Sequence, residues 1–135
     1  MPVYSITSHH TISDADKRRL VDLFTDTHCG LTGAPEQFVH VIFSDGIPIE
    51  GGRELYIHAN VRWGRTPETV ETLRETLVGG SAEILGLPVE KVRINLLEIQ
   101  AKWIMEGGHV MPDPGEEDEW MAKVTAALAE RDQAS

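Results

Sequence analysis

Two stretches of this chain share one layout: SDADKRRLVDLFTDTHCGLTGAP at residues 13–35 and TPETVETLRETLVGGSAEILGLP at residues 66–88. Each begins with a hydroxyl residue suited to cap a helix, continues with apolar residues at helical spacing, and stops at Gly and Pro. Three pairs of these boundary residues are each separated by 53 positions: Ser13 and Thr66, Gly33 and Gly86, and Pro35 and Pro88. The two stretches therefore predict two equivalent helices, the first over residues 14–31.

A β-prone segment precedes and follows each predicted helix. Strands are predicted over residues 1–8, 38–44, 55–61 and 92–97. The result is a tandem βαβ repeat: repeat 1 at about residues 2–45, repeat 2 at about 55–98, and a C-terminal tail at 99–135. The expected fold class is α+β, a single domain with both helices on one face of a four-stranded sheet. The other face is predicted to be apolar and covered by other subunits.

The tail is predicted to form a short helix after an acidic run, Glu116-Glu117-Asp118-Glu119, with Trp120, Val124 and Leu128 on one face. Carboxylates complement the dipole of a helix N-terminus. We therefore interpret the run as an ordinary helix start rather than as a metal site.

Composition excludes several classes of function. The 135 residues carry 12 Lys and Arg against 22 Asp and Glu, a net charge of −10, which disfavours nucleic acid as a partner. No apolar run reaches the roughly 20 residues of a membrane span, and no secretory signal is evident, so a cytoplasmic protein without a membrane partner is predicted. A single cysteine, Cys29, excludes an internal disulfide.

Pro2 is the sharpest candidate for catalysis. Removal of Met1 would leave a secondary amine, and unperturbed α-amino groups titrate at roughly 7.7–8.0. A strand that starts directly after Pro2 would hold this amine on a rigid element. The alternative is a proline at position 2 with no catalytic role.

Arg62 and Arg65 lie between a predicted strand end and the Thr66 helix cap. Guanidinium groups beside the free N–H groups of a helix start suit a carboxylate or phosphate. The alternative is a solvated turn. Antiparallel pairing of the two βαβ units about a local two-fold would place Pro2 near both arginines.

Two further side chains are weaker candidates. His28 falls at the margin of the apolar face of the first helix, where a packed core histidine is the alternative to a functional one. Glu106, in apolar and glycine-rich surroundings, is suited to proton transfer, or else it is an exposed loop glutamate. Cys29 is interpreted as structural.

Together these residues resemble the tautomerase superfamily, in the branch of cis-3-chloroacrylic acid dehalogenase. The resemblance covers about residues 2–121 and rests on an ordered set of matches: Pro2-Val3-Tyr4, Thr25-Asp26-Thr27-His28, Gly30-Leu31-Thr32-Gly33, Arg62-x-Gly64-Arg65, Glu106, and Pro114-Gly115-Glu116-x-x-x-Trp120.

The resemblance implies a role for each matched residue. Pro2 corresponds to the catalytic amino-terminal proline, Arg62 and Arg65 to the pair that binds the substrate carboxylate, and His28 to a histidine that assists binding. Glu106 corresponds to the glutamate that activates water. The family tyrosine that works with this glutamate is replaced by Asn95, which can form hydrogen bonds but cannot act as a phenolic acid.

The resemblance thus implies an amino-terminal-proline tautomerase for small unsaturated or 2-oxo carboxylic acids, with hydratase or cis-3-haloacrylate dehalogenase side activity. It implies a homotrimer and neither cofactor nor metal. A neutral Pro2 amine would be a general base in enol–keto tautomerisation, whereas a cationic one would be a general acid beside water activated by Glu106. Two alternatives remain: a primary hydratase or dehalogenase, and a non-catalytic ligand-binding or cytokine-like member of the superfamily.

Overall fold

The computed structural model describes residues 1–134 and divides the chain into two compact units. The first comprises Met1–Val61 and Arg65–Leu97; the second comprises Arg62–Gly64 and the chain from Glu98 onward. None of the helices within residues 1–134 is both long enough and apolar enough to cross a membrane.

The first unit is built around a four-stranded mixed sheet with the strand order β2-β1-β3-β4. Its strands are β1 (Val3–Ser8), β2 (His40–Asp45), β3 (Leu55–Arg62) and β4 (Val92–Ile99), of which the last residues of β3 and β4 pass into the second unit. Two long helices, α1 (Asp14–Thr32) and α2 (Pro67–Leu85), connect β1 to β2 and β3 to β4. Short 3-10 turns, η1 (Glu36–Phe38), η2 (Glu50–Gly52) and η3 (Val89–Lys91), complete it.

The ends of the two helices are fixed by the residues that the sequence pattern singled out. Ser13 and Thr66 are the N-caps, and each side chain accepts a hydrogen bond from the backbone N–H three residues on. Gly33 and Gly86 end the helices in the left-handed conformation, with φ of 73° and 64°. The bounds of α1 and α2 differ by the same 53 positions, which confirms the predicted repeat.

The pairing of the strands relates the two repeats by a local two-fold. β1 runs parallel to β2 and antiparallel to β3, with Val3 opposite Asn60 and Ser8 opposite Leu55. Ser5 lies opposite His58, its own equivalent 53 positions on, so the two-fold passes between these residues. The start of β1 therefore lies beside the end of β3, as predicted.

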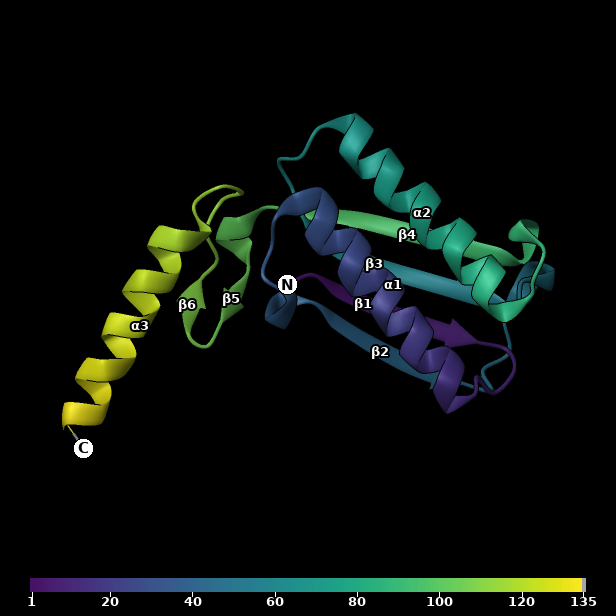
Figure 1. Cartoon of the computed structure of the whole chain (residues 1–135), viewed down its shortest axis with the longest axis horizontal. Coiled ribbons are helices and arrows are strands. Elements are labelled where there is room, and N and C mark those ends of the chain that lie inside the picture. Colours follow the sequence, from purple (N-terminus) through teal and green to yellow (C-terminus); the bar gives the residue numbers. More distant parts are fainter. Residues whose placement is uncertain (135) are drawn as a thin grey trace. The chain divides into compact units, whose positions relative to one another are not determined.

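The core lies between the sheet and the two helices, which pack side by side on one face of the sheet (Figure 1). Alternate residues of β1 and β3 point into it and are fully buried, as in Tyr4, Ile6, Leu55 and Ile57. Leu20 and Phe24 of α1 face Leu73 and Leu77 of α2, the same positions of the repeat.

The opposite face of the sheet differs from the prediction. It was expected to be apolar, but the strands alternate between apolar and polar positions instead. The side chains on the open face are partly or fully exposed and mostly polar: Val3, Ser5, Thr7, His40, Ile42, Ser44, Tyr56, His58, Asn60, Arg93, Asn95 and Leu97. The apolar content of the strands is concentrated on the face that the helices cover, so it indicates burial of one face rather than two.

The second strand begins later than predicted. Residues 36–38 form the 3-10 turn η1, in which Phe38 N–H donates to the Pro35 carbonyl at 3.1 Å. Phe38 is only 9% exposed, so its hydrophobicity reflects packing rather than a strand position. The β2 ladder consequently starts at His40.

The second unit contains a small hairpin of β5 (Met105–Glu106) and β6 (His109–Val110), preceded by the 3-10 turn η4 (Ala101–Trp103). The helix α3 (Glu117–Ala134) follows and is 18 residues long, so the expectation of a short helix was wrong. Within residues 117–134 no side chain of α3 is buried, which explains why its length left only a weak hydrophobic pattern in the sequence.

Candidate active site

The start of the chain is anchored at the end of β3. The carbonyl oxygen of Pro2 accepts a hydrogen bond from the His40 N–H of β2 at 3.0 Å, and Val3 pairs with Asn60 of β3. Pro2 is fully buried and Met1 is only 7% exposed. Residue 2 is thus held by a rigid element, as the position of the first strand predicted.

His28 lies behind this strand, on the buried face of α1, and is 1% exposed. Its Nδ1 atom is 2.6 Å from the hydroxyl oxygen of Tyr4, which is itself fully buried and packs edge-on against Phe24. Burial raises the pKa of the Tyr4 phenol well above its ordinary value; the positive charge of Arg65 opposes this rise and Cys29 adds to it. Tyr4, His28 and Arg65 therefore form one electrostatic neighbourhood in the first unit.

Arg62 is the last residue of β3 and belongs to the second unit, where it is 3% exposed. Its Nη1 atom donates to the Pro112 carbonyl at 2.6 Å, and its Nη2 atom donates to Glu117 Oε1 at 2.5 Å. Burial alone would raise the pKa of Glu117, but the Arg62 hydrogen bond, a backbone hydrogen bond from Gly115 and the Arg62 charge hold this pKa below its ordinary value. The arginine that was predicted to bind the substrate carboxylate is thus bound to a carboxylate of the chain itself, that of Glu117.

The backbone conformation at position 64 explains why the motif Arg62-x-Gly64-Arg65 contains a glycine. Its φ of 116° disfavours any L side chain, and a Cβ built there would lie 3.4 Å from Pro114 Cγ. The close approach of Pro114, together with the bond from Gly115 N–H to Glu117 Oε2 at 2.8 Å, ties the Pro114-Gly115 turn to the same arginine region.

Glu106 lies in the second unit, and Asn95 lies in the first. Glu106 is half-buried in the second unit, where it pairs across the hairpin with His109. Asn95 is exposed on the open face of the sheet, with its Nδ2 atom 3.2 Å from His58 Nδ1. Pro2 directly precedes β1 and is fully buried, and it lies two residues before Tyr4, whose side chain is on the helix-covered side. A single chain therefore does not bring Asn95 to Pro2.

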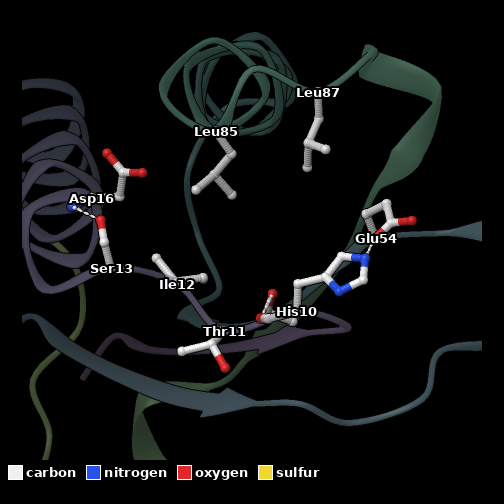
Figure 2. A pocket seen from close by; sticks show the side chains of 9 residues that line it. His10, Thr11, Ile12, Ser13, Asp16, Glu54, Leu85 and Leu87 are labelled. Carbon is white, nitrogen blue, oxygen red and sulfur yellow. Dashed lines mark hydrogen bonds and ion pairs between the residues drawn. The ribbon is translucent and has the colours of Figure 1, made fainter.

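A separate hollow lies at the opposite end of β1, where the chain leaves Ser8. Figure 2 shows His10 and Glu54 facing each other there, with 3.3 Å between Nε2 and Oε2, opposite Leu85 and Leu87 at the end of α2. None of the predicted site residues lines it. Pro2, the predicted catalytic residue, lies at the other end of β1.

Two residues of this region were missed by reasoning from the sequence. Tyr4 stood in the Pro2-Val3-Tyr4 motif, but nothing local indicated that its hydroxyl reaches an imidazole 24 positions away. Glu117 was interpreted only as part of an acidic helix start, because nothing local indicated that its carboxylate reaches Arg62, 55 positions earlier.

The two βαβ units, their antiparallel pairing and the proline at the start of β1 are the architecture of the tautomerase superfamily. The solved structure of N1, a member of the cis-3-chloroacrylic acid dehalogenase (cis-CaaD) family, is 33% identical, with a TM-score of 0.83 and 96% of each chain covered. A native fused 4-OT is 25% identical with a TM-score of 0.70, over 80% of this chain and 94% of that one. MIF2 of Leishmania major is 18% identical, with a TM-score of 0.68, over 80% and 95%, and it shows the fold alone.

This chain belongs to the cis-3-chloroacrylic acid dehalogenase family. No protein-family model matches it, and a comparison with curated proteins gives no match either. Membership supports an enzyme with a tautomerase or dehalogenase function at the level of the family.

Proposed function

We propose that this protein is a tautomerase that uses the amine of Pro2, after loss of Met1, to interconvert the enol and keto forms of small 2-oxo carboxylic acids. The observation that carries the proposal is the pairing of Val3 with Asn60, which holds residue 2 at the end of β3, from which the chain continues to Arg65. Loss of Met1, which is 7% exposed, would free the amine and vacate buried space next to it.

In the proposed reaction the neutral amine takes the proton of the enol hydroxyl and a proton is returned to the carbon. Arg65 binds the substrate carboxylate and stabilises the charge that develops on the enolate oxygen. Arg62 is the second proposed carboxylate ligand, and it contributes only if the substrate carboxylate replaces Glu117 on its guanidinium. His28 is proposed to contact the substrate as well.

Ketonisation of phenylenolpyruvate, followed by ultraviolet absorbance, tests the proposal on protein whose intact mass confirms the loss of Met1. Pro2→Ala removes the ring that fixes the orientation of the amine, and we expect kcat/KM to fall by at least about 100-fold. Pro48→Ala, at an exposed loop proline, is the matched control and should leave the rate unchanged. Retained Met1, or equal rates for wild type and Pro2→Ala, would contradict the proposal.

A second candidate function is hydration or dehalogenation of 3-haloacrylates through water activated by Glu106. The name of the family, carried by the N1 structure, favours it, whereas Asn95 in place of a phenol weakens it. Halide release from cis-3-chloroacrylate, compared in wild type and Glu106→Gln, tests this chemistry. Release that exceeds ketonisation in kcat/KM, and is lost in Glu106→Gln, would make it the primary activity.

We also propose that the protein is a homotrimer that operates in the cytoplasm. The fused 4-OT relatives include an asymmetric trimer, and the mostly polar open face of the sheet suits a hydrated interface rather than an apolar one. Light scattering coupled to size exclusion measures the mass, and a monomer would contradict this. A protein that binds carboxylates without turnover in either assay would instead be a non-catalytic ligand-binding or cytokine-like member.

A further inference from the structure

Three arginines of the first unit line one hollow of about 350 Å³, which we call the basic hollow. They come from three different segments: Arg53 lies two residues before β3, Arg74 lies on α2, and Arg93 is the second residue of β4. Glu75 of α2 lines the hollow as well. Among the described residues, three guanidinium groups and one carboxylate therefore meet here, in a chain with a net charge of −10.

The charges of these arginines are not consumed by strong internal partners. The Arg93 side chain is exposed and forms no hydrogen bond or ion pair within residues 1–134. Arg74 pairs with Glu71 of its own helix, with 3.5 Å between Nε and Oε2 and side chains that are 36% and 58% exposed. So exposed an ion pair is weak, and an external anion can compete for Arg74. Arg53 donates from Nη1 to the Glu90 carbonyl at 3.0 Å, which does not neutralise its charge.

Part of the lining of the basic hollow is apolar. Val78 of α2 and Val92 and Ile94 of β4 lie beside the arginines. Val92 is 5% exposed, and the other two are partly buried against the core. Sites for small molecules combine an apolar lining with a few polar groups that fix the orientation of the ligand. The hollow is therefore suited to an anion that carries an organic group rather than to a bare ion.

The repeat provides an internal comparison. A hollow at the equivalent place in the first repeat lies between α1 and residues 36–39. Four pairs of positions, each 53 residues apart, line the two hollows: Val21 and Arg74, Asp22 and Glu75, Thr25 and Val78, and Val39 and Val92. The hollow of the first repeat is lined by three carboxylates and one guanidinium, those of Asp22, Asp26, Glu36 and Arg18. The same packing of helix on strand thus has the opposite charge in the two repeats, so the fold itself does not require the arginines.

We propose that the basic hollow binds a small organic phosphate monoester, with the phosphate on the three arginines and the organic group against the apolar lining. Such a phosphate carries about −1.5 to −2 charges at pH 7, which matches the excess of three guanidinium groups over one carboxylate. Guanidinium groups bind phosphate oxygens through paired hydrogen bonds, which a lysine does not provide.

This site is separate from the proposed active site. Residue 2 is held where Val3 pairs with Asn60, whereas Arg53 precedes the start of the same strand at Leu55. Five strand positions, roughly 17 Å, lie between the two places. The inference therefore does not depend on the chemistry of Pro2, and loss of the proposed activity would not affect it.

Calorimetric titration with phenyl phosphate at pH 7 tests the site, and we expect a dissociation constant of about 1 mM or tighter. Arg93→Gln changes an exposed side chain without an internal partner, so it should fold normally and weaken binding at least about tenfold. Arg18→Gln, in the acidic hollow of the first repeat, is the matched control and should leave the affinity unchanged. Benzoate, which has the same ring but a single charge, should bind at least about tenfold more weakly.

Two-dimensional nitrogen-15 NMR then locates the ligand. Phenyl phosphate should shift the amide signals of Val92 and Arg93, and it should do so equally in Arg65→Lys, in which the predicted substrate ligand is changed.

Four results would overturn the inference. The first is the absence of phenyl phosphate binding, and the second is an equal loss in Arg93→Gln and Arg18→Gln, which would indicate a general effect of net charge. The third is binding that Arg65→Lys abolishes and Arg93→Gln does not, which would assign the anion to the proposed active site. The fourth is a lower mass of Arg93→Gln in light scattering while wild type binds no phenyl phosphate, which would assign the hollow to a contact between copies of the chain.

Discussion

Arg62 and Glu117 form an ion pair of 2.5 Å that joins the last residue of β3 to the first residue of α3. The side chains are only 2% and 15% exposed. The guanidinium also holds the Pro112 carbonyl, so removal of either partner leaves a buried charge without its counterpart. The pair therefore stabilises the second unit, and Arg62 is also one of the predicted site residues.

Glu117→Gln should destabilise the second unit by about 2 kcal/mol at pH 7, the value of a hydrogen bond to a charged group. Urea unfolding followed by tryptophan fluorescence measures this directly, because all three tryptophans, Trp63, Trp103 and Trp120, lie in that unit. Glu116→Gln, at the exposed neighbouring carboxylate, is the matched control. Equal losses in both variants would show that the helix dipole, rather than Arg62, accounts for the effect.

The same pair predicts a dependence of stability on pH. The folded-state pKa of Glu117 lies below its unfolded value of about 4.3, so its stabilisation is complete above that pH and is lost as pH falls through the folded pKa. The difference in unfolding free energy between wild type and Glu117→Gln should therefore shrink below about pH 4. A difference that stays constant from pH 7 to pH 3 would contradict this assignment.

Two adjacent glycines of α2 should respond to alanine in opposite ways. A Cβ at Gly79 meets nothing within 4 Å, so Gly79→Ala should stabilise the fold by up to about 1 kcal/mol through helix propensity. A Cβ at Gly80 would lie 2.7 Å from Leu23 Cδ2 of α1, so Gly80→Ala should cost about 1–2 kcal/mol. Thermal unfolding of both variants checks this, and similar shifts in Tm would mean that α1 and α2 are less closely packed.

Arg65→Lys should lower kcat/KM for phenylenolpyruvate by at least about tenfold, because lysine keeps the charge but loses the two-pronged contact to a carboxylate. Arg18→Lys, at an arginine whose side chain is 79% exposed, should have no effect. An unchanged rate in Arg65→Lys would assign carboxylate binding to another group.

Cys29 should alkylate slowly at pH 7. Burial raises the pKa of its thiol, and the carboxylates of Glu36 and Asp26 raise it further, so the reactive thiolate is scarce. The iodoacetamide rate, measured against pH, should show a midpoint above that of the urea-unfolded protein. A lower midpoint would indicate an activated cysteine instead of a structural one.

Local chemistry was sufficient to predict the two long helices of the first unit. Ser13 and Gly33 determine the ends of α1 through hydrogen bonds to neighbouring residues and a left-handed φ, and Thr66 and Gly86 do the same for α2. The motif set that included Pro2 and Arg62-x-Gly64-Arg65 was specific enough to identify the superfamily. The predicted roles of Pro2, His28, Arg62, Arg65, Asn95 and Glu106 stay predictions.

Where the predictions from the sequence were wrong, the interaction that decided the structure was between residues far apart in the chain. Whether a β-prone residue such as Ile42 faces helices or the open side depends on the register of the whole sheet, so the polarity of the open face was not evident from composition. Phe38 does not belong to the strand, because it lies in the 3-10 turn η1, where its side chain is buried.

By itself, the sequence determined the helix boundaries, the 53-residue repeat and the family, because caps, turns and motifs act over a few residues. Only the tertiary structure decided that the Tyr4 hydroxyl meets the His28 imidazole and that Glu117 meets Arg62, over separations of 24 and 55 positions. Such pairs depend on where two distant backbones come together, and burial then makes each hydrogen bond obligatory.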